Sequence, residues 1–243
     1  MVKKSIYKHQ KPNSLGQDQF ESIAEYYDDV FPSHITAHYL NKRIRFIKKI
    51  IKQGSVLNVG CGTGLLANSL EKEGFAVTGL DSSSEMLEQA KKRGVKTVLG
   101  VSDSLPFKAN QFNLVVCIGT LHHIADQDKI AKSIKEMVRV VKPGCPVVIW
   151  DHNPNNPYWP ILMRRLPQDR GITRLVPLGE IVEVLKKMGV SKIKVYRKGF
   201  VPDFAPRFLM PVISGIEFVC ERLPLVRFLA AGNVAVAYKK DSS

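Results

Sequence analysis

A glycine-rich loop between an expected strand and an expected helix restricts the fold of this chain more than any other feature. Residues 55–59 form a short apolar run, and Gly60, Gly62 and Gly64 follow it directly before a helical stretch. Glycines at such a turn let the backbone bend tightly and let a ligand approach closely. We therefore predict a nucleotide-type binding loop at the carboxyl end of a buried strand.

The spacing of these glycines separates two kinds of nucleotide loop. A dinucleotide fingerprint has the form G-x-G-x-x-G/A, which from Gly60 requires Gly or Ala at position 65. The chain has Leu65 there, and its third glycine comes one residue earlier. The spacing therefore argues against a dehydrogenase.

The chain downstream of residue 54 alternates short β-branched runs with helical stretches. This alternation builds βαβ units and predicts a mostly parallel sheet with helices on both faces, hence the α/β class. The expected strands cover residues 55–59, 76–80, 96–99, 114–118, 146–150, 193–197 and 234–238. The expected helices of this part cover residues 65–73, 84–93, 129–141 and 178–188.

Two stretches upstream of the loop, residues 20–30 and 36–52, also have a helical pattern. In the second, Ile44, Ile47, Ile50 and Ile51 fall on one stripe, which we expect to pack on the domain. Basic residues cover the rest of this helix, among them Lys42, Arg43, Lys48, Lys49 and Lys52.

Several further segments, in a fixed order, resemble class I S-adenosylmethionine-dependent methyltransferases. Asp81 ends the second expected strand, and the segments 101–107, 112–116 and 139–144 match later signatures of that family. Residues 20–28 also resemble the N-terminal lid of the ubiquinone and menaquinone methylases. The resemblance covers about residues 20–200. It implies a Rossmann-like, seven-stranded, mostly parallel sheet with an N-terminal helical lid.

The resemblance also implies S-adenosyl-L-methionine as cofactor and a set of residues that bind it. Asp81 corresponds to the acid that binds the ribose diol, and Asp103 to the acid that contacts the adenine amino group. Asn58 departs from the family, which usually has an acid there, so its contact with the cofactor lacks charge assistance. The expected cofactor residues are Tyr27, Asn58, Gly60, Cys61, Gly62, Gly64, Asp81, Ser82, Met86, Asp103, Ser104, Leu105 and Gly119.

Two of these residues have alternative explanations that the sequence leaves open. Ser82 and Glu85 form a capping-box pattern, which is a sufficient structural reason for Ser82. Met86 fits the protein core as well as it fits the adenine site. The loop itself also has a simpler interpretation, as a plain strand-to-helix turn.

The acceptor side of the site is expected to contain histidine. In open α/β sheets ligands lie off the carboxyl ends of the strands, which places residues 119–124 and 151–157 beside the acceptor. His122 and His152 are candidate general bases for a hydroxyl or phenol, and Asp151 is a candidate to orient an imidazole or bind the acceptor. The alternatives are a helix-capping or wall-forming role for the histidines and a turn role for Asp151. A base is needed only if the acceptor carries a proton, because the sulfonium is itself electrophilic.

The net charge favours an anionic partner. The 243 residues include 36 Lys and Arg against 22 Asp and Glu, a formal charge of +14. Nucleic acid and a lipid headgroup surface both fit this charge. An amino-methylating signature after the fourth strand is absent, so nucleic acid is the weaker alternative. A non-catalytic cofactor-binding protein is a further alternative.

The cysteines predict neither a disulfide framework nor a zinc site, and no metal is expected. They lie far apart and form no C-x-x-C pair, which fits a reducing cytoplasm. The four positions are Cys61, Cys117, Cys145 and Cys220.

The expected organisation is a basic, flexible arm (residues 1–19) followed by one methyltransferase domain (20–243). The domain divides into N-terminal helices (20–53), a cofactor-binding half (54–151), a Pro-rich acceptor loop (152–177) and an apolar insertion before the last strand (200–232).

The insertion is the least expected part of the chain. Its apolar residues at helical spacing oppose Glu217, Glu221 and Arg222. Our hypothesis is that it docks on an anionic membrane, on the inner face, and delivers a lipophilic acceptor. A cover over the acceptor pocket and a contact between two copies are the alternatives. The apolar residues are Val212, Ile213, Ile216, Val219, Cys220 and Leu223.

Overall fold

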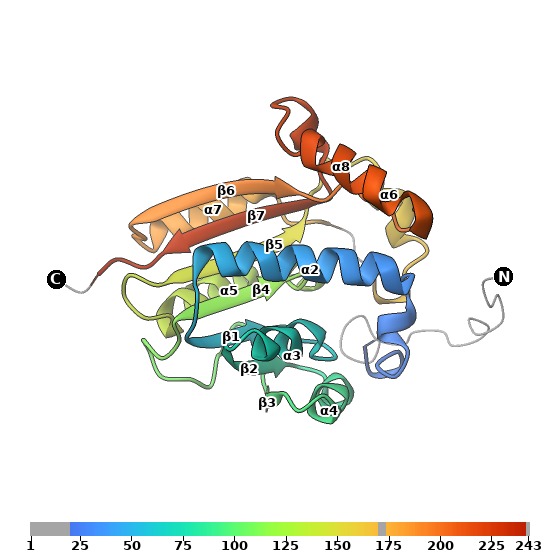
Figure 1. Cartoon of the computed structure of the whole chain (residues 1–243). Helices are drawn as coiled ribbons and strands as arrows, with labels where there is room; N and C mark the ends of the chain where they lie inside the picture. Colours follow the sequence, from blue (N-terminus) through green and yellow to red (C-terminus); the bar gives the residue numbers. More distant parts are fainter. Residues whose placement is uncertain (1–19, 170–173, 242–243) are drawn as a thin grey trace.

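The computed structural model describes residues 20–169 and 174–241, so the predicted arm (1–19) lies outside the described residues. A seven-stranded sheet with strand order β3-β2-β1-β4-β5-β7-β6 forms its centre (Figure 1). The predicted Rossmann-like, mostly parallel sheet is confirmed. The strands are β1 (Ser55–Val59), β2 (Ala76–Asp81), β3 (Lys96–Leu99), β4 (Leu114–Ile118), β5 (Pro146–His152), β6 (Lys192–Lys198) and β7 (Gly232–Tyr238).

Strands β1 to β5 are parallel, and only β7 runs antiparallel to its neighbours β5 and β6. The register aligns Val59 of β1 with Cys117 of β4, and Cys117 with Ile149 of β5. The loops that follow these three strands therefore leave the sheet at one edge. Ligands of open α/β sheets bind at this edge.

Helices cover both faces of the sheet and bury one hydrophobic core on each side (Figure 1). The first core packs α2 (Ser33–Ile50), α3 (Leu65–Lys72) and α4 (Ser84–Lys92) on one face. The second packs α5 (Gln127–Val140) and α7 (Leu178–Lys187) on the other. Ile44 and Ile47 of α2 are buried in the first core, as predicted from their stripe.

The predicted helix over residues 20–30 is wrong in most of its length. Turns fill this segment, with one short 3-10 helix, η1 (Tyr27–Asp29). Tertiary contacts override the helical pattern: Ile23 and Ala24 pack against Met86, and Asp28 accepts a hydrogen bond from the Thr63 hydroxyl at 2.8 Å. Asp28 also pairs with Arg93, so the segment is tied to the glycine loop and to α4.

The described part of the acceptor loop contains two short helical pieces, α6 (Trp159–Met163) and η3 (Pro167–Asp169). Its first part is tied to the end of the insertion. The Asn153 amide donates to two backbone carbonyls there at 2.8 Å, and the Trp159 indole donates to the Ala231 carbonyl at 2.7 Å. The two segments, far apart in sequence, therefore form one wall.

The insertion folds into η4 (Arg207–Leu209), α8 (Met210–Cys220) and η5 (Val226–Leu229). Its helix turns the charged face inward and the apolar face outward. Glu217 is 3% exposed, whereas Val212 is 62% and Ile216 57% exposed. Lys42 bonds to Glu217 at 2.7 Å, and His38 lies 2.8 Å from the same oxygen.

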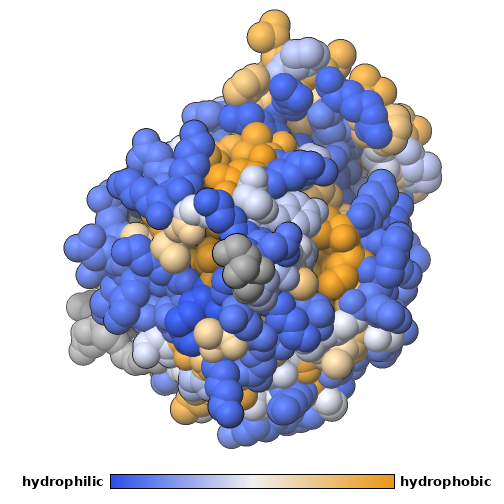
Figure 2. All heavy atoms as spheres, turned by 90° about the vertical axis from the view of Figure 1, so that its left-hand side faces the viewer, coloured by the Kyte–Doolittle hydropathy of each residue, from blue (hydrophilic) through white to orange (hydrophobic). Residues whose placement is uncertain are grey.

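No part of the described chain therefore covers the outward apolar surface. Figure 2 shows orange atoms on the protrusion at the top of the molecule, which Figure 1 shows to be formed by α8 and the end of the insertion. Within the described residues, no helix is long and apolar enough to cross a membrane.

Candidate active site

The glycine loop has the backbone geometry that its sequence predicts. Gly60, Gly62 and Gly64 all have positive φ, at 68°, 53° and 78°. A Cβ on Gly60 would lie 2.2 Å from the Thr120 hydroxyl oxygen, and one on Gly64 2.8 Å from the Ala90 side chain. A Cβ on Gly62 would meet nothing within 4 Å. Gly60 and Gly64 thus allow tight packing, while Gly62 borders open space.

Asp81 connects the glycine loop to the start of α4. Its carboxylate accepts hydrogen bonds from the Gly62 amide at 2.7 Å and from the Ser83 amide at 3.1 Å. Burial raises the pKa of Asp81, and the backbone donors oppose that rise. The carboxylate is therefore held at a fixed place beside the loop.

The predicted capping role of Ser82 is wrong, because the N-cap of α4 is the next residue. The Ser83 hydroxyl accepts a hydrogen bond from the backbone amide of Met86 at 3.2 Å. The turn that Asp81 holds shifts the helix start by one residue. Ser82 lines the cavity described next.

A cavity of about 970 Å³ runs along the carboxyl edge of the sheet, over the glycine loop and under the lid segment. This volume is at the upper end of the range for small-molecule sites. Most of the predicted cofactor residues line it. They are Tyr27, Asn58, Gly60, Cys61, Gly62, Asp81, Ser82, Met86, Asp103 and Gly119.

Three predicted cofactor residues lie elsewhere. Gly64 packs against Ala90 behind the loop. Leu105 is buried in the core, and its amide donates to Glu136 at 2.9 Å. Ser104 is exposed. The loop after β3 therefore offers Asp103 to the cavity, together with its neighbours Val101 and Ser102.

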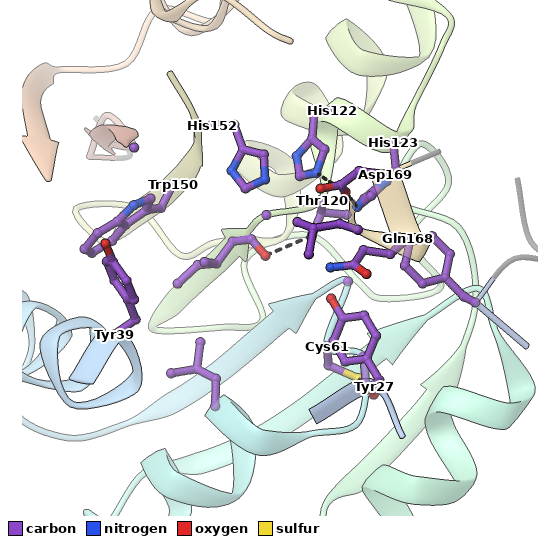
Figure 3. A pocket seen from close by; sticks show the side chains of 18 of the residues that line it. Tyr27, Tyr39, Cys61, Thr120, His122, His123, Trp150, His152, Gln168 and Asp169 are labelled. Atoms are coloured by element: carbon purple, nitrogen blue, oxygen red, sulfur yellow. Dashed lines mark hydrogen bonds and ion pairs between the residues drawn. The ribbon is translucent and has the colours of Figure 1, made fainter. Parts of the chain in front are cut away.

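The acceptor end of the cavity has a wall of stacked rings (Figure 3). His122 stacks on His152 with ring centroids 4.0 Å apart, and His152 stacks on Trp159 at 3.7 Å. The His123 ring lies beside that of His122, with ring centroids 4.0 Å apart and planes tilted by 43°. The wall brings residues from the loops after β4 and β5 together, as the prediction required.

Asp151 does not line the cavity but lies behind this wall, and it holds His122. One carboxylate oxygen is 2.5 Å from Nδ1 of His122, and the other accepts a hydrogen bond from the backbone amide of His122 at 3.2 Å. The first oxygen also accepts the His152 amide at 2.7 Å. Of the two predicted roles, orienting an imidazole fits this position and direct contact with an acceptor does not.

The three histidines of this wall differ in the direction of their pKa shifts. Burial alone would lower the pKa of His122, but the charge and hydrogen bond of Asp151 outweigh it and raise the pKa to about 9. Burial and the neighbouring His122 hold the pKa of His152 well below its ordinary value. Burial also holds the pKa of His123 low. His152 therefore presents a neutral ring to the cavity.

Arg43 was missed from the sequence, where it counted among the basic residues on the outer side of its helix. The structure places it in the cavity wall, and its Nε is buried without a hydrogen-bond partner in the part of the chain that is described. Burial lowers the pKa of its guanidinium. A position one residue from the apolar stripe, next to Ile44, was the only signal.

Gln168 and Asp169 were also missed. Both lie on η3, line the cavity and are nearly buried, at 7% and 4% exposure. Gln168 Oε1 and Asp169 Oδ2 have no hydrogen-bond partner among residues 20–169 and 174–241. Nothing in a Pro-rich loop sequence indicates which of its polar residues turn inward.

Comparison with known proteins identifies a family and a relative that this chain resembles. Residues 56–144 match the model of a family described as methyltransferase domain. A ubiquinone biosynthesis O-methyltransferase of Escherichia coli is 30% identical over 174 residues, which cover 66% of this chain and 69% of that protein.

Two solved structures have the same fold. A protein of Thermotoga maritima, described as an S-adenosylmethionine-dependent methyltransferase and possible histamine N-methyltransferase, superposes with a TM-score of 0.71. It is 20% identical, and the match covers 92% of this chain and 99% of that one. A phosphoethanolamine N-methyltransferase of Haemonchus contortus, solved with S-adenosylhomocysteine, gives a TM-score of 0.63 at 20% identity, over 95% of this chain and 61% of that one.

The fold, the loop and the cavity define a class I, Rossmann-like methyltransferase. This chain belongs to the family of S-adenosylmethionine-dependent methyltransferases, and S-adenosyl-L-methionine is its cofactor.

Proposed function

We propose that this enzyme transfers a methyl group to a hydroxyl oxygen of a lipophilic small molecule. The observation that carries the proposal is the single cavity that joins the glycine loop to a wall of aromatic and imidazole rings. Tyr39, Trp150 and Trp159 supply apolar surface on the acceptor side. The similarity to ubiquinone biosynthesis O-methyltransferases supports the same class of acceptor.

The cofactor is proposed to lie along the glycine loop, with its ribose at Asp81 and its adenine near Met86 and Asp103. Its ammonium is proposed to face Asn58. We propose that Arg43 binds its carboxylate, because a buried guanidinium whose Nε has no partner among the described residues is a fitting partner for a planar anion. Asp28 and Tyr27 bring the lid segment over this end of the cavity.

The cofactor, when bound, supplies an electrophilic methyl group. His152 is proposed as the base that takes the acceptor hydroxyl proton, since its ring is in the cavity wall. His122 and Asp151 are positioning residues for it. The Asp151 carboxylate fixes the His122 ring and the His152 backbone, and the His122 and Trp159 rings hold His152 between them.

A labelled-methyl assay tests the acceptor class. Purified protein is incubated with methyl-labelled S-adenosylmethionine and, in separate reactions, with a lipid extract, water-soluble metabolites and total RNA. We expect label in the lipid extract, in a product that resists mild alkali as an ether does. Label confined to RNA or to water-soluble metabolites would contradict the proposal. His152→Ala should reduce lipid labelling by about 100-fold or more at unchanged cofactor affinity.

We also propose that the insertion docks this enzyme on an anionic membrane surface. The apolar residues Phe208, Val212, Ile216 and Leu225 of the insertion are all exposed, and Phe208 and Leu225 are 80% and 85% exposed. Arg207, Arg222 and Arg227 accompany them. Apolar groups beside basic ones suit the interface of an anionic bilayer, where each basic group adds about 1 kcal/mol.

The position of the insertion relative to the cavity supports this role. Phe200, Val201 and Pro202, at its start, line the cavity, and Tyr158 of the acceptor loop donates to Asp203 at 2.5 Å. A lipophilic acceptor in the membrane would therefore enter the cavity beside the docked surface.

Vesicle co-sedimentation tests the docking. Native protein should bind phosphatidylglycerol vesicles at low salt, less at high salt, and little to phosphatidylcholine vesicles. The double variant Val212→Glu, Ile216→Glu should lose binding. Val195→Glu, at an exposed apolar residue of β6, is the matched control and should retain it. Native protein that does not bind anionic vesicles but forms a dimer through Val212 and Ile216 would contradict membrane docking.

A further inference from the structure

Three potential metal ligands converge at the edge of the stacked-ring wall (Figure 3). Nε2 of His122 lies 3.7 Å from Oδ1 of Asp169, and Nε2 of His123 lies 4.0 Å from the same oxygen. One potential ligand atom from each of the three residues lies within 4.8 Å of the other two. Two imidazoles and one carboxylate are a common donor set for divalent transition metals.

A hydrogen bond orients the His122 imidazole, and ring packing places the His123 imidazole beside it. Nδ1 of His122 is bonded to Asp151 at 2.5 Å, which leaves Nε2 to face Asp169. A carboxylate behind a histidine in this way is the usual outer partner of a metal-bound imidazole. The His123 ring is held between His122 and the edge of Phe20, whose centroid is 4.8 Å away.

Asp169 provides a second, independent observation that points to a cation. Its Oδ2 is buried and has no hydrogen-bond partner within the described residues, although the side chain borders the cavity. A buried carboxylate oxygen without a partner is unfavourable unless a ligand compensates it. Oε1 of the neighbouring Gln168 is buried and unpartnered as well. Both atoms are acceptors, so the group that fills this space must be a cation or a donor.

We propose that His122, His123 and Asp169 bind one divalent transition-metal ion, of the class of Zn²⁺, Mn²⁺ or Co²⁺, in the wall of the acceptor cavity. Two ligand atoms at about 2.1 Å from one ion are roughly 3 Å apart at a right angle and about 4 Å apart at wide angles. The distances of 3.7 and 4.0 Å lie in this range. A small rotation of the His123 ring completes the set.

The cluster formed by His122, Asp151 and His152 is the competing site. Its carboxylate is already occupied by one imidazole nitrogen and two backbone amides. One oxygen of Asp169 has no hydrogen-bond partner among the described residues, which favours the site on its side. An ion there would leave its open positions toward the cavity and would lower the pKa of a hydroxyl bound to it. Ion binding itself does not depend on the proposed acceptor.

Metal titration of the chelator-treated native protein tests the site. Isothermal titration with Zn²⁺ should give one equivalent of tight binding, and Co²⁺ should give the visible absorption of a low-coordinate site with nitrogen ligands. Mg²⁺ in excess should not compete, because imidazoles suit transition metals better. Native protein that binds no Zn²⁺ or Co²⁺, or that loses them to Mg²⁺, would overturn the proposal.

Three variants locate the ion. Asp169→Asn and His123→Ala should each weaken Zn²⁺ binding by about 100-fold or more, while His152→Ala should bind it normally. If His152→Ala loses Zn²⁺ binding and Asp169→Asn retains it, the ion lies at the competing site and the proposed site is refuted. S-adenosylhomocysteine binding, measured on each variant, reports that it is folded. A failure of methyl transfer with Zn²⁺ binding intact would count against the proposed function alone.

Discussion

Single residues in the cavity carry the cofactor proposal, and Asp81 is the most directly testable. Its carboxylate holds the glycine loop through the Gly62 amide and is proposed to bind the ribose diol. Asp81→Ala should weaken S-adenosylmethionine binding by about 1.5–3 kcal/mol, because a charged acceptor is lost. Isothermal titration measures this, with Asp203→Ala as a control at the far end of the cavity. Equal affinities for native protein and Asp81→Ala would mean that the ribose is bound elsewhere.

Arg43 gives a sharper test, because its proposed partner can be removed from the ligand. Arg43→Met should weaken S-adenosylmethionine binding by about 2 kcal/mol, since a charge-assisted contact is lost. It should bind decarboxylated S-adenosylmethionine as native protein does. A similar loss for both ligands would show that Arg43 shapes the cavity without contacting the carboxylate.

At the scale of elements, α8 is held by buried charge. Burial would raise the pKa of Glu217, but the His38 contact and the Lys42 charge outweigh it and lower the pKa to about 2. Lys42 and Lys198 also pair with the neighbouring Glu221. A pKa below the unfolded value of about 4.3 means that Glu217 stabilises the native state fully above that pH. This stabilisation is lost as the pH falls toward 2.

Glu217→Gln should therefore destabilise the protein by about 3 kcal/mol at pH 7, and the difference from native protein should shrink between about pH 4 and 2. Urea unfolding at several pH values measures it. Glu180→Gln, at an exposed pair with Arg174, should have little effect at any of them. A difference for Glu217→Gln that does not change with pH would show that its charge is unimportant.

The same elements show what a sequence can and cannot predict. The strands before β6 were placed almost to the residue, because buried β-branched runs and glycine breaks are local signals. The lid at residues 20–30 was not, since its conformation depends on Thr63 and Arg93. The inward face of α8 was also unpredictable, because His38 and Lys42 lie on a distant helix.

The candidate site likewise contains residues that a local sequence pattern predicts and residues that it does not. The glycine loop, Asp81 and the histidines follow strands at one sheet edge, so a local pattern found them. Arg43 lines the cavity from α2, and Gln168 and Asp169 line it from a Pro-rich loop. Those features depend on packing of the whole domain and leave no periodic signal.

At the scale of the whole molecule, one sheet edge brings together the cofactor loop, the ring wall and the insertion. The lid covers one end of the cavity, and the insertion borders the other with its apolar surface turned outward. In the proposed function, this arrangement places the polar cofactor and the lipophilic acceptor in one cavity. Under the proposed function, the order of events would be membrane docking, acceptor entry and methyl transfer.

The central claim is that this cavity holds S-adenosylmethionine, and titration calorimetry tests it most directly. S-adenosylmethionine and S-adenosylhomocysteine should each bind native protein once, with dissociation constants in the micromolar range, and NAD should give no heat. Binding of NAD without either of the other two ligands would contradict the account.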